Sequence, residues 1–245
     1  MSHAPFLADD DRRMPLPGEE LLTHPGYALW PGIAPLPHPR LMVHVGAESV
    51  ENFLVVGDAW GQLIASLLAP HAQVLDIGCG CGRTARTLLH HPYVAGYLGF
   101  DVVPAYPAWC NHHLSPLSAG RFRFAHLDVH TPRYNPAGQI AGAAARFPAT
   151  DGSCTLAFAG SLFTHLREPD AHRYLTETRR VLAAGGLLVA STHDQVPANG
   201  GWSGDEHRAD VAPVHFIAMA QAAGLRHERT IPDVCGQRTF LFRVD

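Results

Sequence analysis

Residues 74–83 read VLDIGCGCGR, and this stretch decides the fold. An apolar run ends in Asp76, glycine then occupies every second position from 78 to 82, and residues 84–89 (TARTLL) are suited to a helix. The pattern predicts a buried strand, a turn too tight for side chains and the amino end of a helix. At such a junction the backbone can approach a ligand closely, and free helix N–H groups point at it. We therefore expect a ligand site at this loop.

Beyond this stretch, apolar strand-like runs alternate with helical segments. Such alternation predicts an α/β fold with a parallel, doubly wound sheet. The tail differs, because its last two strands are joined only by a turn at 233–236, and so short a connection requires an antiparallel hairpin. The predicted strands cover about 73–77, 96–101, 121–127, 153–160, 185–192, 225–231 and 237–244, and the predicted helices about 49–68 (with a break allowed at Gly57), 82–91, 106–118, 169–183 and 212–223.

The chain divides into an arm and a domain. Residues 1–47 are rich in proline, which disfavours regular structure. They nevertheless include Tyr27 and Trp30, and apolar residues of this kind indicate an arm packed on the domain rather than a free tail. Residues 48–245 are expected to form the domain itself.

The composition excludes several classes of protein. The chain has 245 residues, 47% of them hydrophobic and 16% charged, as expected for a compact domain. Its net charge of −4 disfavours a nucleic-acid partner. No run reaches the roughly 18 apolar residues of a membrane span, and the amino-terminal residues do not resemble a signal peptide. We expect a cytoplasmic protein without a membrane partner.

Cysteine and lysine usage narrows the chemistry further. Five scattered cysteines indicate free thiols in a reducing compartment. Cys79 and Cys81 form a CxC without a second thiol pair, so no metal site is expected there. The chain contains no lysine at all. That absence excludes a Walker A phosphate loop and any catalysis through a lysine Schiff base.

Acidic residues follow the first predicted strands, at the edge where ligands bind in an open α/β sheet. Asp76 can hydrogen-bond loop N–H groups or the amine of a ligand. Asp101, 25 positions later, can accept from both hydroxyls of a ribose, and Val102 beside it can pack on an adenine. A dinucleotide site uses the same acid but prefers GxGxxG, whereas this chain has GxGxG followed by Arg83 and Thr84. The glycine pattern therefore disfavours a dinucleotide.

The acid followed by GxGxG resembles motif I of the class I S-adenosylmethionine-dependent methyltransferases. Two further segments, SLFTHL at 161–166 and RRVLAAGGLLV at 179–189, resemble a bacterial subgroup that reads SVFTHL and RRVLxPGG there. The likeness covers about residues 73–193. Ala184 replaces the usual proline of this subgroup, and residues 153–154 (SC) stand where the family often has Phe-Asp.

The resemblance implies a seven-stranded sheet of order 3-2-1-4-5-7-6, with S-adenosylmethionine as the cofactor and S-adenosylhomocysteine as its product. It also implies that Asp128 accepts from the adenine amino group while Val129 offers a backbone N–H to the ring. The fourth strand would end at the family's fourth motif. The expected cofactor-binding residues are Asp76, Ile77, Gly78, Cys79, Gly80, Arg83, Asp101, Val102, Asp128, Val129, Gly160 and Ser161.

Methylation of a hydroxyl or an amine also requires removal of a proton, for which a nearby histidine can serve. His165 follows the fourth predicted strand and His193 the fifth, so these two are the candidate catalytic residues among 17 histidines. An insertion at 131–146 and a glycine-containing loop at 195–210 are expected to shape the acceptor site, the latter as a mobile lid. The candidate substrate-pocket residues are Tyr27, Trp30, Tyr134 and Trp202.

These observations predict methyl transfer from S-adenosylmethionine to a small-molecule or glycan-type acceptor. Two alternatives stay open. One is a non-catalytic module of the same fold that binds a partner protein. The other is an NAD(P)-dependent oxidoreductase, although a chain without lysine cannot supply a Tyr-x-x-x-Lys pair.

Overall fold

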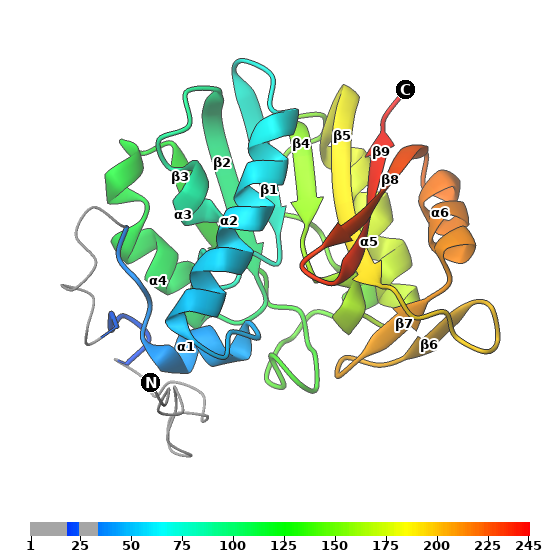
Figure 1. Cartoon of the computed structure of the whole chain (residues 1–245), viewed down its shortest axis with the longest axis horizontal. Helices are drawn as coiled ribbons and strands as arrows, with labels where there is room; N and C mark the ends of the chain where they lie inside the picture. Colours follow the sequence, from blue (N-terminus) through cyan, green and yellow to red (C-terminus); the bar gives the residue numbers. More distant parts are fainter. Residues whose placement is uncertain (1–18, 25–33) are drawn as a thin grey trace.

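The computed structural model describes residues 19–24 and 34–245 (Figure 1). Tyr27 and Trp30, two of the predicted pocket residues, lie outside the described residues. The strands are β1 (Ala72–Ile77), β2 (Val94–Asp101), β3 (Phe122–His126), β4 (Cys154–Ala159), β5 (Leu182–His193), β6 (Trp202–Gly204), β7 (Ala209–Val211), β8 (Arg226–Val234) and β9 (Gln237–Arg243). The α-helices are α1 (Pro39–His44), α2 (Val50–Leu67), α3 (Ala85–Leu88), α4 (Ala105–His113), α5 (Glu168–Val181) and α6 (Pro213–Ala222), and the 3₁₀ turns are η3 (Pro116–Ser118), η4 (Gly142–Ala144) and η5 (Phe163–His165).

Seven strands form one sheet in the order β3-β2-β1-β4-β5-β9-β8. Strands β1 to β5 pair in parallel, whereas β9 runs antiparallel to both β5 and β8. Counted along the predicted strands, this is the order 3-2-1-4-5-7-6, so the predicted fold class is confirmed. The carboxyl ends of the parallel strands point toward α1 and the β6–β7 hairpin, at the lower edge of Figure 1.

Alternate residues along the strands feed two hydrophobic cores, one on each face of the sheet. On one face Val74 and Phe158 pack with residues of α1, α2 and α4, including Trp60. On the other face Leu75 joins a core that contains residues of α5 and α6. Because a parallel sheet covered on both faces buries nearly all its side chains, its strands are apolar runs broken mainly at their ends. Polar residues at those ends are therefore conspicuous.

The long helix α2 passes through Gly57 without a break. It begins where the Ser49 side chain accepts a hydrogen bond from the backbone N–H of Asn52, at 3.0 Å. A Cβ at Gly57 would collide with the backbone carbonyl oxygen of Arg83, in the segment that leads into α3. The glycine thus permits close contact between this helix and the segment after the glycine loop, which is why a residue that weakens helices is placed here.

Three segments differ from the sequence-based expectation. The helix after the glycine loop is short, because α3 covers only Ala85–Leu88 rather than 82–91. The helix predicted over 106–118 ends at His113 and continues as the 3₁₀ turn η3. The loop predicted over 195–210 contains the antiparallel pair β6–β7. Its strands have three residues each, too few to give a recognisable alternation of apolar and polar residues.

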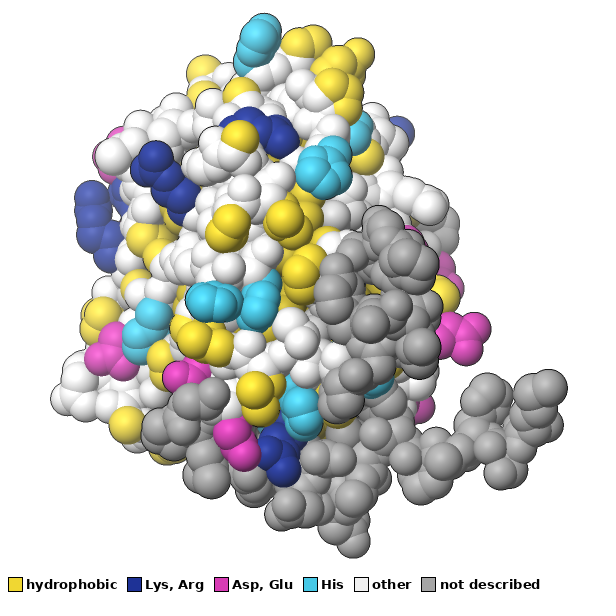
Figure 2. Space-filling model, turned by 90° about the vertical axis from the view of Figure 1, so that its left-hand side faces the viewer, with side chains coloured by type: hydrophobic (Ala, Val, Ile, Leu, Met, Phe, Trp, Pro, Cys, Tyr) yellow, Lys and Arg dark blue, Asp and Glu magenta, His cyan; other side chains and the backbone are white. Residues whose placement is uncertain are grey.

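The amino-terminal segment contacts the domain where it is described. The indole N–H of Trp109 on α4 donates to the carbonyl of Leu22 at 3.1 Å, and a ring nitrogen of His113 lies 2.7 Å from the carbonyl oxygen of Leu21. Figure 2 shows the left-hand side of the molecule, turned by 90° from Figure 1. On that face arginine side chains are interspersed with histidine and apolar side chains, and the described residues form no continuous basic stripe there.

Candidate active site

A cavity of about 470 Å³ lies at the carboxyl ends of the parallel strands. Its wall combines the glycine loop, the ends of β2 and β4, the α1–α2 region, the insertion after β3 and the β8–β9 turn. The residues that line it are Val43, His44, Val45, Gly46, Asn52, Val56, Trp60, Asp76, Gly78, Cys79, Gly80, Arg83, Thr84, Phe100, Asp101, Val102, Tyr106, Arg133, Tyr134, Phe158, Gly160, Ser161, Leu162, His165, Tyr174, Cys235 and Gln237. Concave, partly apolar pockets of this size hold small molecules and cofactors.

Asp101 ends β2 and ties the glycine loop to the loop that follows it. Its Oδ2 accepts from the backbone N–H of Gly80 at 2.8 Å, and its Oδ1 accepts from that of Val103 at 2.9 Å. Burial raises the pKa of Asp101 to about 6, and the backbone hydrogen bonds oppose that rise. Each carboxylate oxygen can accept more than one hydrogen bond, so Asp101 can hold the loop and still accept from hydroxyls of a ligand.

Asp76 ends the apolar run of β1 and is 3% exposed. The hydroxyl of Tyr97, on the neighbouring strand β2, donates a hydrogen bond to its Oδ2. Burial raises the pKa of Asp76 to about 7, and the hydrogen bond from Tyr97 acts in the opposite direction. A positively charged group of a ligand would favour the ionised form of this buried carboxyl group.

The glycine loop brings its backbone to the cavity wall. Gly80 has a φ of +51°, and a Cβ there would lie 2.7 Å from Cγ1 of Val45, in the turn after α1. Gly78 has a φ of +77°, and its backbone N–H donates to the carbonyl of Phe100 at 2.9 Å. The loop is therefore held in a conformation that favours glycine, with the α1–α2 turn packed directly on it.

Arg83 follows the glycine loop and provides a cation on the same side of the cavity as Asp76. Its Nη1 donates to the carbonyl of Val45 at 3.1 Å, and burial lowers its pKa from the usual arginine value. Among the described residues no carboxylate oxygen lies within 4.0 Å of its guanidinium. A ligand carboxylate is the group that such a guanidinium binds best.

The end of β4 is fixed by hydrogen bonds from two other strands. Ser161, with a φ of +62°, donates its backbone N–H to Oγ of Ser191 on β5 at 2.8 Å. Gln237 on β9 donates from Nε2 to Oγ of Ser161 and accepts at Oε1 from Oγ of Ser191, each at 2.7 Å. The backbone N–H of Ser161 and the three side chains form a closed network, and Ser161 and Gln237 line the cavity.

His165 faces the insertion across the cavity. Its ring and that of Tyr134 meet edge to face with centroids 5.9 Å apart. Burial, together with the charge of Arg133, lowers the pKa of His165 to about 4. The imidazole is therefore neutral at pH 7. Arg133 itself lies over the ring of Tyr134, 5.0 Å from its centroid.

Several polar atoms in the cavity wall lack hydrogen-bond partners within the described part of the chain. They are Oδ1 of Asn52, the hydroxyl of Tyr106 and Nδ1 of His165. Buried polar groups without a partner are costly, so these atoms indicate a wall built for a polar ligand. The arrangement offers acceptors at Asp76 and Asp101, a cation at Arg83 and an orphaned hydroxyl at Tyr106.

The structure brings most of the predicted cofactor residues together. Asp76, Gly78, Cys79, Gly80, Arg83, Asp101, Val102, Gly160 and Ser161 all line the cavity, as do Tyr134 and His165 of the predicted acceptor site. Ile77 and Val129 do not line it, because both side chains lie in the hydrophobic core beneath the site.

Asp128 is placed differently from the expectation that came from the resemblance. It does not line the cavity; instead its Oδ1 accepts from Nδ2 of Asn135 at 3.1 Å and its Oδ2 from the backbone N–H of Gln139 at 3.3 Å. Its carboxylate holds the insertion against the end of β3.

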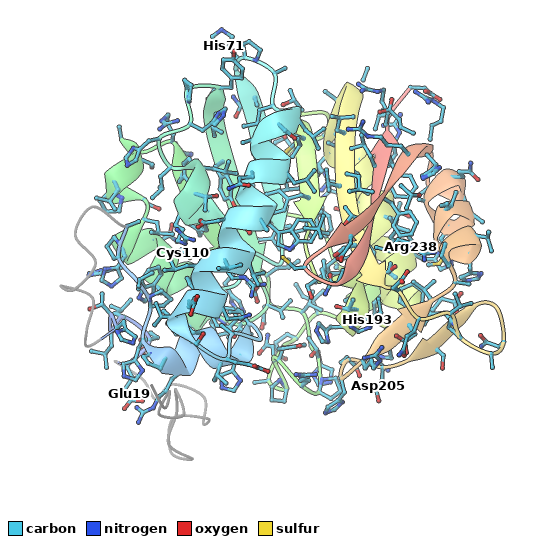
Figure 3. All side chains as sticks on the ribbon, in the orientation of Figure 1. Glu19, His71, Cys110, His193, Asp205 and Arg238 are labelled. Atoms are coloured by element: carbon cyan, nitrogen blue, oxygen red, sulfur yellow. The ribbon has the colours of Figure 1, made fainter. Side chains whose placement is uncertain are left out.

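His193 and Trp202 also lie away from the cavity lining. Figure 3 shows His193 near the β6–β7 hairpin. Its Nδ1 is 3.0 Å from the carbonyl oxygen of Ala209 and 3.1 Å from Oδ1 of Asp210, so the ring anchors that hairpin. Trp202, the first residue of β6, is 8% exposed and packs in the core.

Several residues of the wall were not identified from the sequence. Trp60 and Asn52 come from α2, Tyr106 from α4, and Gln237 from β9, all distant in sequence from the glycine loop. These four residues form no sequence motif. Each is a single position on a helix or strand whose pattern of apolar and polar residues reflects packing against the core. Arg133 was part of the predicted insertion, but nothing in the sequence distinguished it from Arg146.

The described residues, 19–24 and 34–245, do not meet the requirements of a membrane-spanning helix or of a metal site bound by three or more side chains. Within them, no helix combines the length and the apolar character that crossing a membrane would demand. Nor do three or more His, Cys, Asp or Glu side chains gather there in a way that could hold a metal ion.

Comparison with known proteins agrees with this fold. Residues 74–186 match the family described as "Methyltransferase domain". A TehB-like SAM-dependent methyltransferase from Corynebacterium glutamicum has a similar structure, with a TM-score of 0.56 and 19% identity over 76% of this chain and 88% of that one. The 1,6-didemethyltoxoflavin-N1-methyltransferase from Burkholderia thailandensis, solved with S-adenosylhomocysteine, gives a TM-score of 0.61 and 16% identity over 82% of this chain and 84% of that one.

A third structure with the same fold is described as the [4+2]-cyclase SpnF. It has a TM-score of 0.60 and 17% identity over 76% of this chain and 81% of that one. At such identities the likeness establishes the fold alone. The chain therefore has the Rossmann-like fold of the S-adenosylmethionine-dependent methyltransferases, and its residues 74–186 are similar to the family described as a methyltransferase domain.

Proposed function

We propose that this protein transfers a methyl group from S-adenosylmethionine to a hydroxyl or amine of a small-molecule or glycan-type acceptor. The observation that carries the proposal is the hydrogen bond from the backbone N–H of Gly80 to Asp101. It joins the glycine loop to the acid that is expected to bind a ribose, at the wall of the cavity. The fold does not fix the reaction, as the cyclase relative demonstrates, so the argument depends on the site.

The residues of the cavity fit S-adenosylmethionine. Asp101 would accept from the ribose hydroxyls, with Val102 beside them. Along the glycine loop, Asp76 would face the ammonium group of the methionine portion, and Arg83 its carboxylate. Both pairings join opposite charges in a partly buried site, where such interactions are strongest.

When bound, the cofactor supplies a methyl carbon that is already activated by a sulfonium leaving group. The protein's contribution is to align the acceptor with that carbon and to exclude water. The chemistry that the cofactor would supply is a displacement at that carbon: the bond to the acceptor oxygen or nitrogen would form as the carbon–sulfur bond breaks, with S-adenosylhomocysteine as the leaving group and the acceptor proton passing to water. His165 lines the same cavity with a neutral imidazole, so it can orient the acceptor by a hydrogen bond. Its low pKa makes it a weak store for the proton.

Thermal shift measurements with S-adenosylhomocysteine and with NADH test the donor assignment. We expect S-adenosylhomocysteine to raise the melting temperature of the wild-type protein and NADH to leave it unchanged. Asp101→Ala should abolish the shift, whereas the control Asp245→Ala, at the exposed carboxyl terminus, should keep it. Stabilisation by NADH alone would favour the oxidoreductase alternative. Failure to bind either ligand would favour a module that binds a partner protein.

A further inference from the structure

We propose that the turn at residues 131–135 recognises an oxyanion on the methyl acceptor, and that Arg133 is the residue that binds it. The inference rests on the proposed function, because it assigns the acceptor side of the same cavity. It names the class of acceptor as a small molecule that carries a carboxylate or a phosphate group.

Arg133 offers a guanidinium to the cavity whose charge is not matched by an acid. Its Nη1 donates to the backbone carbonyls of Glu206, at 3.4 Å, and His207, at 2.9 Å. Within the described part of the chain, none of the ion pairs involves Arg133. An arginine has five N–H donors in a fixed fork, so most of them are available to a ligand.

Hydrogen bonds fix the conformation of the turn that contains Arg133. Thr131 and Asn135 exchange two backbone hydrogen bonds of 3.1 Å each, and Oγ1 of Thr131 accepts from the backbone N–H of Tyr134 at 3.0 Å. The buried side chain of Asn135 then fastens the turn to Asp128 and to the carbonyl of Val129. The ring of Tyr134 supports the guanidinium from below, 5.0 Å from its centroid. A charge presented by so well connected a turn is pre-organised for binding.

Two neighbouring groups show that a polar ligand is expected at this side. The hydroxyl of Tyr106, a residue 3% exposed, lines the cavity without a partner among the described residues, and so does Nδ1 of His165. The guanidinium of Arg133 lies over the ring of Tyr134, whose edge meets the ring of His165, and its charge acts to lower the pKa of both His165 and Tyr106. An oxyanion bound at Arg133 would compensate that charge and could accept from the Tyr106 hydroxyl.

The second cation of the cavity, Arg83, lies on the side of the cavity that is assigned to the methyl donor. It lies beside the glycine loop, with its charge acting on Asp76 and Cys81. The carboxylate of the methyl donor is therefore assigned to Arg83, which leaves Arg133 for the acceptor. The forked geometry of arginine suits both planar carboxylates and phosphates, so the test must separate the two.

The test compares matched probes on protein saturated with S-adenosylhomocysteine. Calorimetry measures the affinity of benzoate, phenyl phosphate and the neutral isostere benzamide. We expect at least one anionic probe to bind about tenfold or more tightly than benzamide, as a charge-assisted hydrogen bond implies. A preference for benzoate over phenyl phosphate would assign a carboxylate, and the reverse order a phosphate.

Two variants decide whether Arg133 is responsible. Arg133→Gln should remove the preference for the anion while leaving the affinity for S-adenosylhomocysteine within about twofold. Arg146→Gln is the matched control, since Arg146 lies on the same insertion, is exposed, and pairs with Asp151 at 3.7 Å rather than lining the cavity. It should bind every probe like the wild type.

Equal binding of benzoate, phenyl phosphate and benzamide, or no binding of any of them, would overturn the inference. So would a preference for anions that survives in Arg133→Gln. Loss of S-adenosylhomocysteine affinity in that variant would assign Arg133 to the donor and also overturn it. Failure of the proposed function has a different signature, because the wild-type protein would then not bind S-adenosylhomocysteine in the first titration.

Discussion

The hydroxyl of Tyr97 donates a hydrogen bond to the carboxylate of Asp76, and both side chains are buried. Tyr97 is itself fixed by stacking on Phe122, with ring centroids 4.4 Å apart. The acid of the glycine-loop motif is therefore positioned from below by a residue of the neighbouring strand. That arrangement holds the carboxylate at the cavity wall although burial alone favours its neutral form.

Replacing Tyr97 by phenylalanine removes the donor and keeps the ring. The pKa of Asp76, already raised to about 7 by burial, should rise further, because the lost hydrogen bond favoured the charged form. We expect the affinity for S-adenosylhomocysteine at pH 7 to fall about tenfold, and the free energy of unfolding to fall by about 1–2 kcal/mol. Calorimetry and urea denaturation measure the two effects. Tyr93→Phe, at a position 45% exposed, is the control and should change neither. Equal behaviour of the two variants would contradict the role given to Tyr97.

The pH dependence of cofactor binding follows from the two raised carboxyl pKa values. Asp76 and Asp101 titrate near 7 and 6, and their charged forms are the ones that attract an ammonium group and accept from ribose hydroxyls. The affinity for S-adenosylhomocysteine should therefore increase from pH 5 to pH 8, by about tenfold or more. Titrations across this range in buffers of equal ionic strength measure it. An affinity independent of pH would contradict the assignment.

In the ligand-free protein, ionisation of Asp76 and Asp101 lowers the free energy of unfolding, whereas it favours cofactor binding. Their pKa values are higher in the folded than in the unfolded chain, so their contribution to stability is fully present below about pH 4 and is lost as the pH rises toward 7. Stabilisation by S-adenosylhomocysteine should consequently be greatest near pH 8, where both carboxylates are charged without a cation bound beside Asp76. A thermal shift that is larger at pH 5 than at pH 8 would be inconsistent with this sign.

Gly80→Ala tests the close packing over the glycine loop. Its φ is +51°, and the new Cβ would lie 2.7 Å from Val45 Cγ1. Gly120→Ala is matched to it, because Gly120 has a φ of +79° but no atom within 4 Å of a Cβ. In the control the free energy of unfolding should fall by only about 1 kcal/mol, the cost of the backbone conformation. In Gly80→Ala it should fall by about 2 kcal/mol or more, and most of the affinity for S-adenosylhomocysteine should be lost. Similar losses in both variants would show that Val45 yields at no cost.

Asp128 distinguishes the structure from the family resemblance. Its carboxylate holds Asn135 and Gln139 rather than facing the cavity, so Asp128→Ala should loosen the turn at 131–135. We expect faster hydrogen exchange at residues 131–139 and a smaller loss of S-adenosylhomocysteine affinity than in Asp101→Ala. Complete loss of that affinity with unchanged exchange in the turn would support the adenine contact instead.

The sheet could be predicted from the sequence because buried parallel strands are apolar runs and their polar ends stand out. Asp76 and Asp101 were recognised in this way, and both line the cavity. The antiparallel hairpin was predicted from the length of the β8–β9 connection alone. In contrast, β6 and β7 have three residues each, so local pattern could not separate them from a loop.

The remaining wall of the site depends on tertiary packing that no local pattern records. Gln237 reaches Ser161 only because β9 inserts between β5 and β8. Asp128 and Val129 were assigned by resemblance, yet the insertion uses the carboxylate of Asp128 for its own hydrogen bonds, and the backbone N–H of Val129 donates to the carbonyl of Leu127 at 2.7 Å. Contacts of this kind form only when the insertion packs against the end of β3, which is why a pattern of sequence motifs does not predict them.

Calorimetric titration of S-adenosylhomocysteine into the wild-type protein at pH 8 tests the central claim most directly. We expect one site per chain with a dissociation constant in the micromolar range, corresponding to about −8 kcal/mol, and loss of the binding heat in Asp101→Ala. No binding heat from the wild-type protein at millimolar ligand, or an undiminished affinity in Asp101→Ala, would contradict it.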